Sequence, residues 1–156
     1  MENSVTNGID NTHFGPKNSC TRAQVVTFLW RAAGCPKPTT TVNPLTDVKA
    51  GAYYYDAVLW AVENGITNGL TATTFGTGKT VTRAQFVTFL YRAEKGASSG
   101  AANPFTDVKA GAYYYDAVLW AVENGITNGL TATTFGPGST CNRGQVVTFL
   151  YRCFVK

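Results

Sequence analysis

The sequence repeats itself at an interval of about 60 residues, and this repetition constrains the fold more than any other feature. Residues 46–76 and 106–136 are identical, and a diverged copy, ENSVTNGIDNTHFG, occupies residues 2–15. A small unit of this kind cannot bury its apolar face alone, so its copies stack on one another. The sequence therefore predicts one compact assembly of similar units.

Two linkers rich in Pro, Gly, Ser and Thr separate the units, at residues 36–44 and 95–104. They divide the chain into a half repeat at residues 1–35, a full repeat at 45–94 and a second full repeat at 105–156. The half repeat begins where the other copies have already finished their first helix. One helix of an expected six is thus missing. The chain is then a piece of a longer one, or another chain fills the gap, or the assembly tolerates five helices, and an open apolar seam should favour self-association.

Each full unit is predicted to contain two helices and a loop, which makes the fold mainly α. The first helix should run over residues 53–64 and 113–124, ending at Gly65 and Gly125, because glycine accepts a positive φ after a helix. Short strands are expected only in the loops after these glycines, where Thr and Phe cluster between turn residues.

The first helix presents two faces. Ala57, Val58 and Ala61 recur at helical spacing and should face the core. Asp56 and Trp60 fall on another side, as do Asp116 and Trp120 in the next copy. A tryptophan beside a carboxylate could hold a sugar by stacking and hydrogen bonding, or it could simply pack against the next unit. Both interpretations remain open at this point.

The second helix begins with a capping motif, TRAQ at residues 21–24 and 82–85 and NRGQ at 142–145. Thr82 with Gln85 fits the capping box, in which each side chain bonds the other residue's backbone N–H. In the third copy, Gly144 in the first turn should weaken the helix start.

An arginine stands at the first helical position of all three copies, at Arg22, Arg83 and Arg143. The helix dipole disfavours a cation there, so its recurrence predicts a fork for a carboxylate or phosphate at a bare helix N-terminus. The alternative is a structural ion pair with Asp47 or Asp107. As a first-turn residue, Arg83 is expected to be exposed and to contribute little to stability.

Together these motifs resemble the S-layer homology domain. The resemblance is carried by Leu or Phe before T-D-V, then YYYDAVLWAVENGITNG, TTFGPGST, and (T/N)R(A/G)Q followed by VVTFLYR. It implies three repeats in a pseudo-threefold assembly at the bacterial cell surface or secreted, with grooves that bind secondary cell-wall polysaccharide. The terminal sugar of that polymer often carries a pyruvate ketal, which the arginine of the family motif meets. The residues expected to bind ligand are Arg22, Arg83, Arg143, Gln85, Asp56, Trp60, Asp116 and Trp120.

The chain departs from the family pattern where Gln24, Gln85 and Gln145 replace a glutamate, and where TATTFG stands in place of an Asp-Gly pair. Arg83 is predicted to matter most for binding, because it alone lies in an intact motif within a full repeat that another full repeat follows. The competing hypothesis is a surface module whose aromatic residues bind a partner or host protein.

Composition excludes several other classes. The 13 basic and 9 acidic residues are scattered singly, which disfavours nucleic-acid binding, and no apolar stretch is long enough to span a membrane. No cofactor or metal site is expected from one histidine and four separated cysteines, for which free thiols are favoured over a Cys20–Cys141 or Cys35–Cys153 bridge. The single histidine, the candidate general base, is not repeated in the other copies, and no serine lies on the sharp strand-to-helix turn that activates a nucleophile. The chain is therefore predicted to be non-catalytic.

Overall fold

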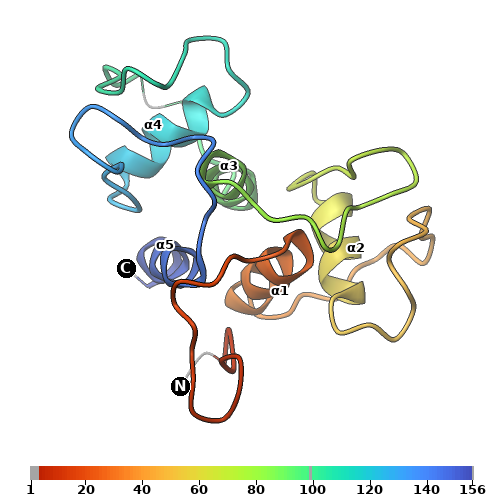
Figure 1. The fold of residues 1–156 in the computed structure, drawn as a ribbon. Helices are drawn as coiled ribbons and strands as arrows, with labels where there is room; N and C mark the ends of the chain where they lie inside the picture. The colour runs from red at the N-terminus through yellow and green to blue at the C-terminus, as the bar shows by residue number, and fades with distance from the viewer. Residues whose placement is uncertain (1–3, 99, 156) are drawn as a thin grey trace.

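The computed structural model describes residues 4–98 and 100–155, and this part of the chain contains five α-helices (Figure 1). They are α1 (Arg22–Ala32), α2 (Tyr55–Glu63), α3 (Arg83–Ala93), α4 (Tyr115–Glu123) and α5 (Arg143–Phe154). The prediction of a mainly α fold is confirmed. In place of the expected short strands, the described residues form isolated bridges, Ser19 with Asn142, Thr21 with Thr80 and Thr82 with Thr140.

The second helices of the three units, α1, α3 and α5, stand around a common centre, while α2 lies outside α1 and α4 lies outside α3 (Figure 1). The segments that lead into the three central helices meet one another. The backbone N–H of Val81 donates to the carbonyl of Cys20 at 3.1 Å, and that of Cys141 donates to the carbonyl of Val81 at 2.9 Å. Equivalent positions of the repeats therefore surround a pseudo-threefold axis.

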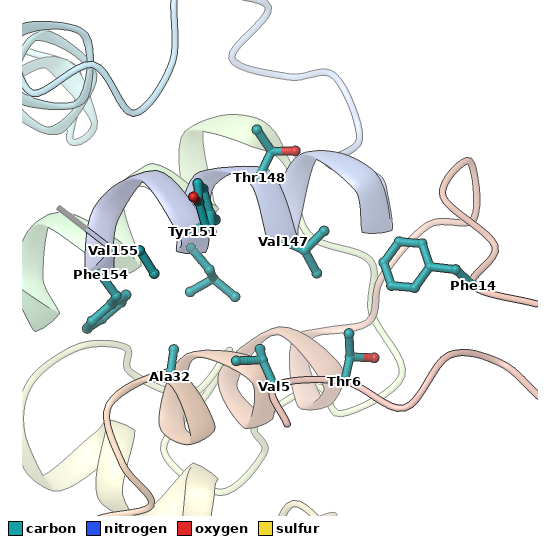
Figure 2. Close-up of a pocket in the computed structure, with 10 residues that line it drawn as sticks. Val5, Thr6, Phe14, Ala32, Val147, Thr148, Tyr151, Phe154 and Val155 are labelled. Atoms are coloured by element: carbon teal, nitrogen blue, oxygen red, sulfur yellow. The ribbon is translucent and has the colours of Figure 1, made fainter. Parts of the chain in front are cut away.

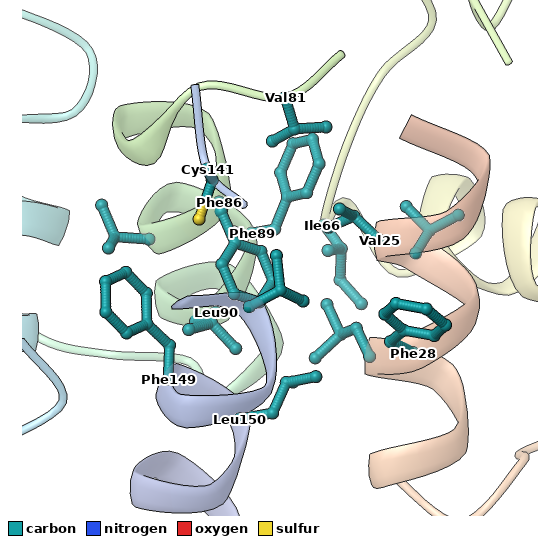
Figure 3. Close-up of a cluster of buried hydrophobic side chains, with 14 of the residues drawn as sticks. Val25, Phe28, Ile66, Val81, Phe86, Phe89, Leu90, Cys141, Phe149 and Leu150 are labelled. Carbon is teal, nitrogen blue, oxygen red and sulfur yellow. The ribbon is translucent and has the colours of Figure 1, made fainter. Parts of the chain in front are cut away.

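The hydrophobic core lies between the three central helices (Figure 3). The rings of Phe86 and Phe149 stack with centroids 6.1 Å apart, and Val25, Phe86 and Leu90 are completely buried. Each such side chain contributes about 1.5–3 kcal/mol by leaving water. Because the core draws side chains from every repeat, no unit is stabilised by its own residues alone.

The first helices are shorter than predicted at their N-terminal ends. α2 and α4 begin at Tyr55 and Tyr115, two residues later than expected, because the preceding residues form turns. The N–H of Tyr55, for example, donates to the carbonyl of Ala52 at 3.0 Å. The C-terminal prediction is confirmed, since Gly65 and Gly125 follow the helices with φ of 67° and 69°.

The second helices start as predicted. α1, α3 and α5 each carry a complete capping box, with Thr21, Thr82 and Asn142 as N-caps. Gly144 does not prevent the third box from forming, because the side chain of Asn142 still accepts from the backbone N–H of Gln145 at 2.9 Å. The three arginines consequently occupy the same first helical position in all repeats.

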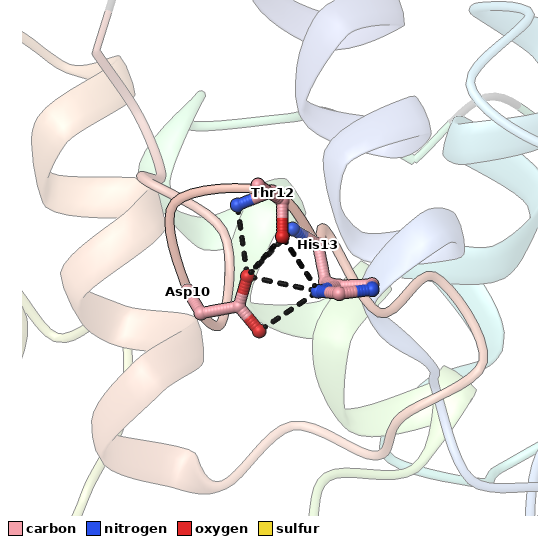
Figure 4. Close-up of polar contacts among 3 residues, drawn as sticks. All are labelled: Asp10, Thr12 and His13. Carbon is pink, nitrogen blue, oxygen red and sulfur yellow. Dashed lines mark hydrogen bonds and ion pairs between the residues drawn. The ribbon is translucent and has the colours of Figure 1, made fainter.

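The first repeat contributes a loop and α1 but no helix before that loop among residues 4–98 and 100–155. Glu2 and Asn3, where the diverged copy begins in the sequence, lie outside the described residues, and the proposed repeat boundaries stay a prediction. The backbone turn in this loop matches that of the second repeat, since the N–H of Ile9 donates to the carbonyl of His13 as that of Leu70 does to that of Thr74, both at 2.8 Å. The side chains of the first-repeat turn differ (Figure 4). Asp10 and His13 contact each other at 2.9 Å, where Thr71 and Thr74 of the second repeat pair through their hydroxyls at 2.7 Å.

Candidate functional site: three arginine junctions

Each arginine at the start of a central helix reaches into the loop of the next repeat, and we call this contact an arginine junction. In the Arg22 junction, Nε donates to the carbonyl of Phe75 at 2.9 Å, and Nη2 donates to the Thr67 hydroxyl at 3.2 Å and the Asn68 carbonyl at 2.9 Å. The guanidinium also lies 4.6 Å from the centre of the Phe75 ring, within the range of a cation–π contact. Repeats one and two are thereby joined.

The other two junctions continue the same pattern around the axis. Nε of Arg83 in the second repeat donates to the carbonyl of Phe135 in the third, at 2.9 Å. Nε of Arg143 in the third repeat donates to the carbonyl of Phe14 in the first, also at 2.9 Å. Each repeat therefore holds its successor, and the last holds the first, so the three junctions close a ring.

The helix N-termini at these junctions are not bare, contrary to the expectation of an open anion site. The backbone N–H groups of Arg22 and Ala23 donate to the carbonyls of Lys79 and Thr77, at 2.7 and 3.3 Å. The next N–H, that of Gln24, is taken by the capping threonine. Loop carbonyls thus satisfy the donors that an anion would otherwise use.

The three arginines are buried, which corrects the expectation that Arg83 is an exposed residue of little structural weight. Their side chains are only 2–4% exposed. The reason is that the neighbouring repeat packs over the helix start, and nothing in a single repeat reveals this. Burial lowers the pKa of Arg22 and of Arg83, and nearby Asp47 and Asp107 respectively act in the opposite direction.

Asp47 and Asp107, beside the junctions, accept hydrogen bonds from the loops. Among the described residues neither forms an ion pair with an arginine within 4.0 Å. Asp47 accepts the backbone N–H groups of Phe75 and Gly76, each at 2.7 Å. Asp107 holds the third-repeat loop in the same way. Burial acts to raise the pKa of both carboxyl groups, but these N–H bonds outweigh it and the pKa of each is lowered.

One nitrogen of each guanidinium remains free of protein acceptors. Nη1 of Arg22, Arg83 and Arg143 bonds to no acceptor within residues 4–98 and 100–155, whereas Nε and Nη2 are both used. In the same part of the chain, no buried side-chain nitrogen or oxygen lacks a partner. Nη1 therefore keeps access to solvent and offers one charged donor in each junction.

Tyr113, at the start of the third repeat, is a residue that the sequence interpretation passed over and that influences Arg22 electrostatically. Its side chain is 63% exposed, and it lies near enough to Arg22 for each to affect the other's pKa. Burial raises the pKa of Tyr113, with a smaller opposing effect from Arg92 and Arg22. The signal in the sequence was the YYY run, in which the ring of Tyr113 packs edge-to-face on that of Tyr114, with centroids 5.1 Å apart.

The other residues predicted to bind ligand are distributed around the junctions. Gln85 bonds the backbone N–H of Thr82 and so completes a capping box. Trp60 and Trp120 are each 8% exposed and pack in the core, Trp120 edge-to-face with Tyr91 at 5.6 Å. These indoles leave little surface for a sugar to stack on.

The two helix carboxylates lie at the surface against the linkers. Asp56 lines a cleft of about 380 Å³ together with Lys37 and Thr40, and Asp116 accepts the Ser98 hydroxyl at 3.1 Å. Neither contacts the buried guanidinium groups through a hydrogen bond or ion pair that the described residues contain.

Within the described residues, no three His, Cys, Asp or Glu side chains gather as potential metal ligands. No disulfide joins the four cysteines, of which Cys35 is exposed and the others are buried. None of the helices in this part of the chain is both long and apolar enough to cross a bilayer.

The ring of helical repeats joined by arginine junctions defines a modular repeat domain, and comparison with known proteins identifies the family. The model of the S-layer homology domain matches residues 2–26, 44–87 and 104–147. The chain belongs to the S-layer homology domain family, a family of cell-wall anchoring modules. The resemblance seen in the sequence is thus confirmed.

Three relatives illustrate where such domains occur. The Surface-layer 125 kDa protein of Lysinibacillus sphaericus is 36% identical over 75% of this chain and 10% of its own length. The Cell surface protein of Thermoanaerobacter kivui is 34% identical over 70% of the chain and 15% of its own. An Endoglucanase of Bacillus sp. (strain KSM-635) is 32% identical over 71% of the chain and 12% of its own.

The chain therefore spans 10–15% of the length of these relatives, and the similarity to the endoglucanase covers only this region. S-layer homology domains are typically non-catalytic modules. The family and its relatives place the chain among bacterial cell-surface proteins.

Proposed function

We propose that the domain anchors its protein by binding an acidic polysaccharide of the cell wall, with Nη1 of the junction arginines as the charged donor. The observation that carries the proposal is a buried guanidinium whose Nη1 donates to no acceptor, and which pairs with no carboxylate, within the described ranges 4–98 and 100–155. A cation held by neutral carbonyls and hydroxyls still attracts an anion. A hydrogen bond between ionised partners in such surroundings is stronger than a neutral one. The pyruvate ketal of a wall sugar supplies a suitable carboxylate.

The Arg22 junction is the best candidate among the three. Arg22 and the exposed tyrosine Tyr113 influence each other's pKa, and the Tyr113 ring offers a face on which a sugar can stack. The Arg83 junction has no such tyrosine among the residues that affect its arginine's pKa. We therefore place the main binding site at Arg22 rather than at Arg83, whose side chain offers the donor without the aromatic surface.

Three weak sites on one domain act together on a polymer. Once one junction holds a sugar, the others meet the same strand at a high effective concentration, so avidity exceeds the affinity of any single site. A single charge-assisted hydrogen bond, worth about 1.5–3 kcal/mol, is then sufficient for anchoring.

The proposal is tested first on intact walls. The purified chain is sedimented with cell-wall sacculi of Lysinibacillus sphaericus before and after chemical removal of the wall polysaccharide, and again after removal of the pyruvate groups alone. We expect most of the chain to pellet with untreated walls and little with either treated sample. Equal pelleting in all three samples would remove the acidic polysaccharide as the ligand.

A second experiment locates the site. Calorimetric titration of a pyruvylated amino-sugar fragment should show roughly three- to tenfold weaker binding for Tyr113→Ala than for the wild type, since stacking on an aromatic ring contributes about 1 kcal/mol. Tyr151→Ala is the matched control, because Tyr151 is equally exposed, at 64%, lies on α5 and is not among the groups that affect the pKa of Arg22. Neither exposed ring stabilises the core, so both variants should unfold with the wild type. Equal affinities for the two variants would move the site elsewhere.

A further inference from the structure

Two of the three residues that meet where the segments leading into α1, α3 and α5 converge are cysteines. Cys20, Val81 and Cys141 each stand one residue before the N-cap of their helix. The bridge between Ser19 and Asn142 is antiparallel, so the next residues along these two segments, Cys20 and Cys141, stand directly opposite each other. We call their side chains the axial thiols.

Val81 fixes the two cysteines from the third side of the axis. Its N–H donates to the carbonyl of Cys20 at 3.1 Å, and its own carbonyl accepts from the N–H of Cys141 at 2.9 Å. Directly opposite residues of an antiparallel pair have Cα atoms about 4.5–5.5 Å apart, and a disulfide spans about 4.4–6.8 Å between Cα atoms. The backbone therefore presents the two cysteines at a separation that a disulfide can bridge.

Both axial thiols lie in the core between the central helices. Each is 0% exposed and belongs to the same apolar cluster, in which Figure 3 shows the sulfur of Cys141. Cys20 contributes to the raised pKa of Cys141, so the two thiols are near enough to interact. The bridges among residues 4–98 and 100–155 align no other pair of cysteines in this way.

From this register we propose that Cys20 and Cys141 form a redox-controlled disulfide, which joins the first repeat to the third when a low-molecular-weight disulfide oxidises the reduced chain. The linkers already connect the first repeat to the second and the second to the third. No segment of the chain runs directly from the third repeat to the first, and their contact is held by packing and by bonds such as those of Arg143 with Phe14 and Thr6, at 2.9 and 2.8 Å. The disulfide adds a covalent connection to this contact.

The reaction consists of two thiol–disulfide exchanges, in which two electrons pass from the protein to the small disulfide. One axial thiol loses its proton to solvent, and its sulfur attacks the small disulfide. The S–S bond of that reagent breaks, and one small thiolate leaves and takes up a proton. The second axial thiol then loses its proton and attacks the protein sulfur of the mixed disulfide, which releases the second small thiol. The products are the Cys20–Cys141 bond and two molecules of small thiol.

Burial determines when this exchange can take place. It raises the pKa of Cys20 to about 11 and that of Cys141 to about 12, so the closed fold keeps both groups as unreactive thiols. The exchange therefore needs the segments at the axis to be open, as they are during folding. Disulfides persist at cell surfaces, and the closed core then shields the bond from reducing agents.

The test uses the whole chain, which is reduced, unfolded in urea and refolded in a mixture of oxidised and reduced glutathione. Digestion without reductant, followed by mass spectrometry, identifies which cysteines are joined. We expect the peptides that contain Cys20 and Cys141 to be linked in most of the folded chain. The linked chain should unfold roughly 10 °C above the reduced chain, because the bond closes a loop of roughly 120 residues. Dithiothreitol during unfolding should abolish the difference.

Two variants use the residue that the second repeat already has at this position. Cys141→Val should fold, because Val81 is completely buried at the equivalent place, and its unfolding midpoint should not depend on glutathione. The double variant Cys20→Val with Val81→Cys places thiols at positions 81 and 141, which the antiparallel bridge between Thr82 and Thr140 also sets opposite each other. In this variant the bond should join position 81 to Cys141.

The proposal is overturned if the wild type refolds without the Cys20–Cys141 link, or if most of the folded chain joins an axial thiol to Cys35 or Cys153 instead. A linked chain that is no more stable than the reduced chain would also overturn it, as would a folded double variant that forms no bond between positions 81 and 141. The inference is independent of glycan binding, because every measurement is made without a sugar.

Discussion

The Arg83 and Arg143 junctions contain the same arginine contact in different surroundings. Both guanidinium groups donate from Nε to a phenylalanine carbonyl at 2.9 Å. Phe135, under the guanidinium of Arg83, is 0% exposed and packs against Phe105 with ring centroids 5.7 Å apart. Phe14, under that of Arg143, is half-buried at the edge of an open groove of about 690 Å³ beside α5 (Figure 2). A local motif therefore fixes the hydrogen bonds of a junction, while the next layer of packing decides how much water reaches it.

The largest effect should come from removing the phenylalanine rings. Phe135→Ala should lower the free energy of unfolding by about 3–5 kcal/mol, because it leaves a cavity in closed surroundings. Phe14→Ala should cost about half as much, since water already reaches that ring and can fill the space. Urea unfolding followed by circular dichroism measures both. Equal costs would mean that the open groove does not weaken the first-repeat junction.

Removal of the arginines should follow the same order with smaller values. Arg83→Ala leaves the Phe135 carbonyl and the Thr127 hydroxyl buried without their donor and should cost about 2–3 kcal/mol. Arg143→Ala should cost about 1–2 kcal/mol, because Thr6 and Phe14 can turn to water. The same unfolding experiment decides it, and a larger loss for Arg143→Ala would reverse the proposed ranking of the two junctions.

The stability of the Arg83 junction should depend on acidic pH through Asp107, which has no counterpart beside Phe14 among the described residues. The folded-state pKa of this carboxyl is lowered, since bonds from the Phe135 and Gly136 N–H groups outweigh the effect of burial. Its stabilising contribution is therefore present above the unfolded pKa of about 3.9 and is lost as the pH falls below that value.

Asp107→Asn should consequently cost about 1 kcal/mol near neutral pH and flatten the loss of stability between about pH 5 and pH 2. Asp116→Asn, on the exposed side of α4, serves as the control. Thermal unfolding midpoints across this range provide the measurement. If the unfolding midpoint of Asp107→Asn falls with acid as steeply as that of the wild type, another carboxylate controls the acid sensitivity.

The smallest effect concerns the thiols at the pseudo-threefold axis. Burial raises the pKa of Cys20 to about 11 and that of Cys141 to about 12, and nearby Arg143 and Arg83 respectively oppose these shifts. At pH 8, iodoacetamide should modify the exposed Cys35 within minutes and the two axial thiols only on unfolding. The stability that depends on protonated thiols is present below about pH 9 and is lost as the pH rises toward 11.

Mass spectrometry of the alkylated chain follows each thiol, and Cys20 should become reactive at lower pH than Cys141. Modification of Cys141 as fast as Cys35 in the native state would contradict the closed packing at the axis.

The repeats, the starts of α1, α3 and α5, and their capping boxes could be predicted from the sequence, because each depends on residues within one turn or one period. The N-cap function of Thr82 needed only Gln85 three residues away. The late start of α2 was missed because the turn at Ala52 competes with the helix for the same N–H groups. Such boundary errors arise from local competition that propensity alone does not resolve.

The burial of the arginines could not be predicted in the same way. Arg22 meets a carbonyl 53 residues away, on a loop that another repeat presents. The buried indole of Trp60 and the exposed ring of Tyr113 follow from the same docking, which no periodicity within a helix encodes. The sequence did contain one indication of burial: an arginine at a helix N-terminus, where the dipole disfavours it, must be stabilised by acceptors. These acceptors are neutral backbone carbonyls rather than an anion.

The closed ring also sets an order in time as the chain leaves the ribosome. The Arg22 and Arg83 bonds join residues 53 and 52 apart, so each can form soon after its second partner is synthesised. The Arg143 bond joins residues 129 apart and needs α5. Until α5 emerges, the loop around Phe14 has no arginine to hold it, so this early loop of the domain is the last of the three to be secured. A product that ends before α5 therefore leaves the loop around Phe14 open to proteases.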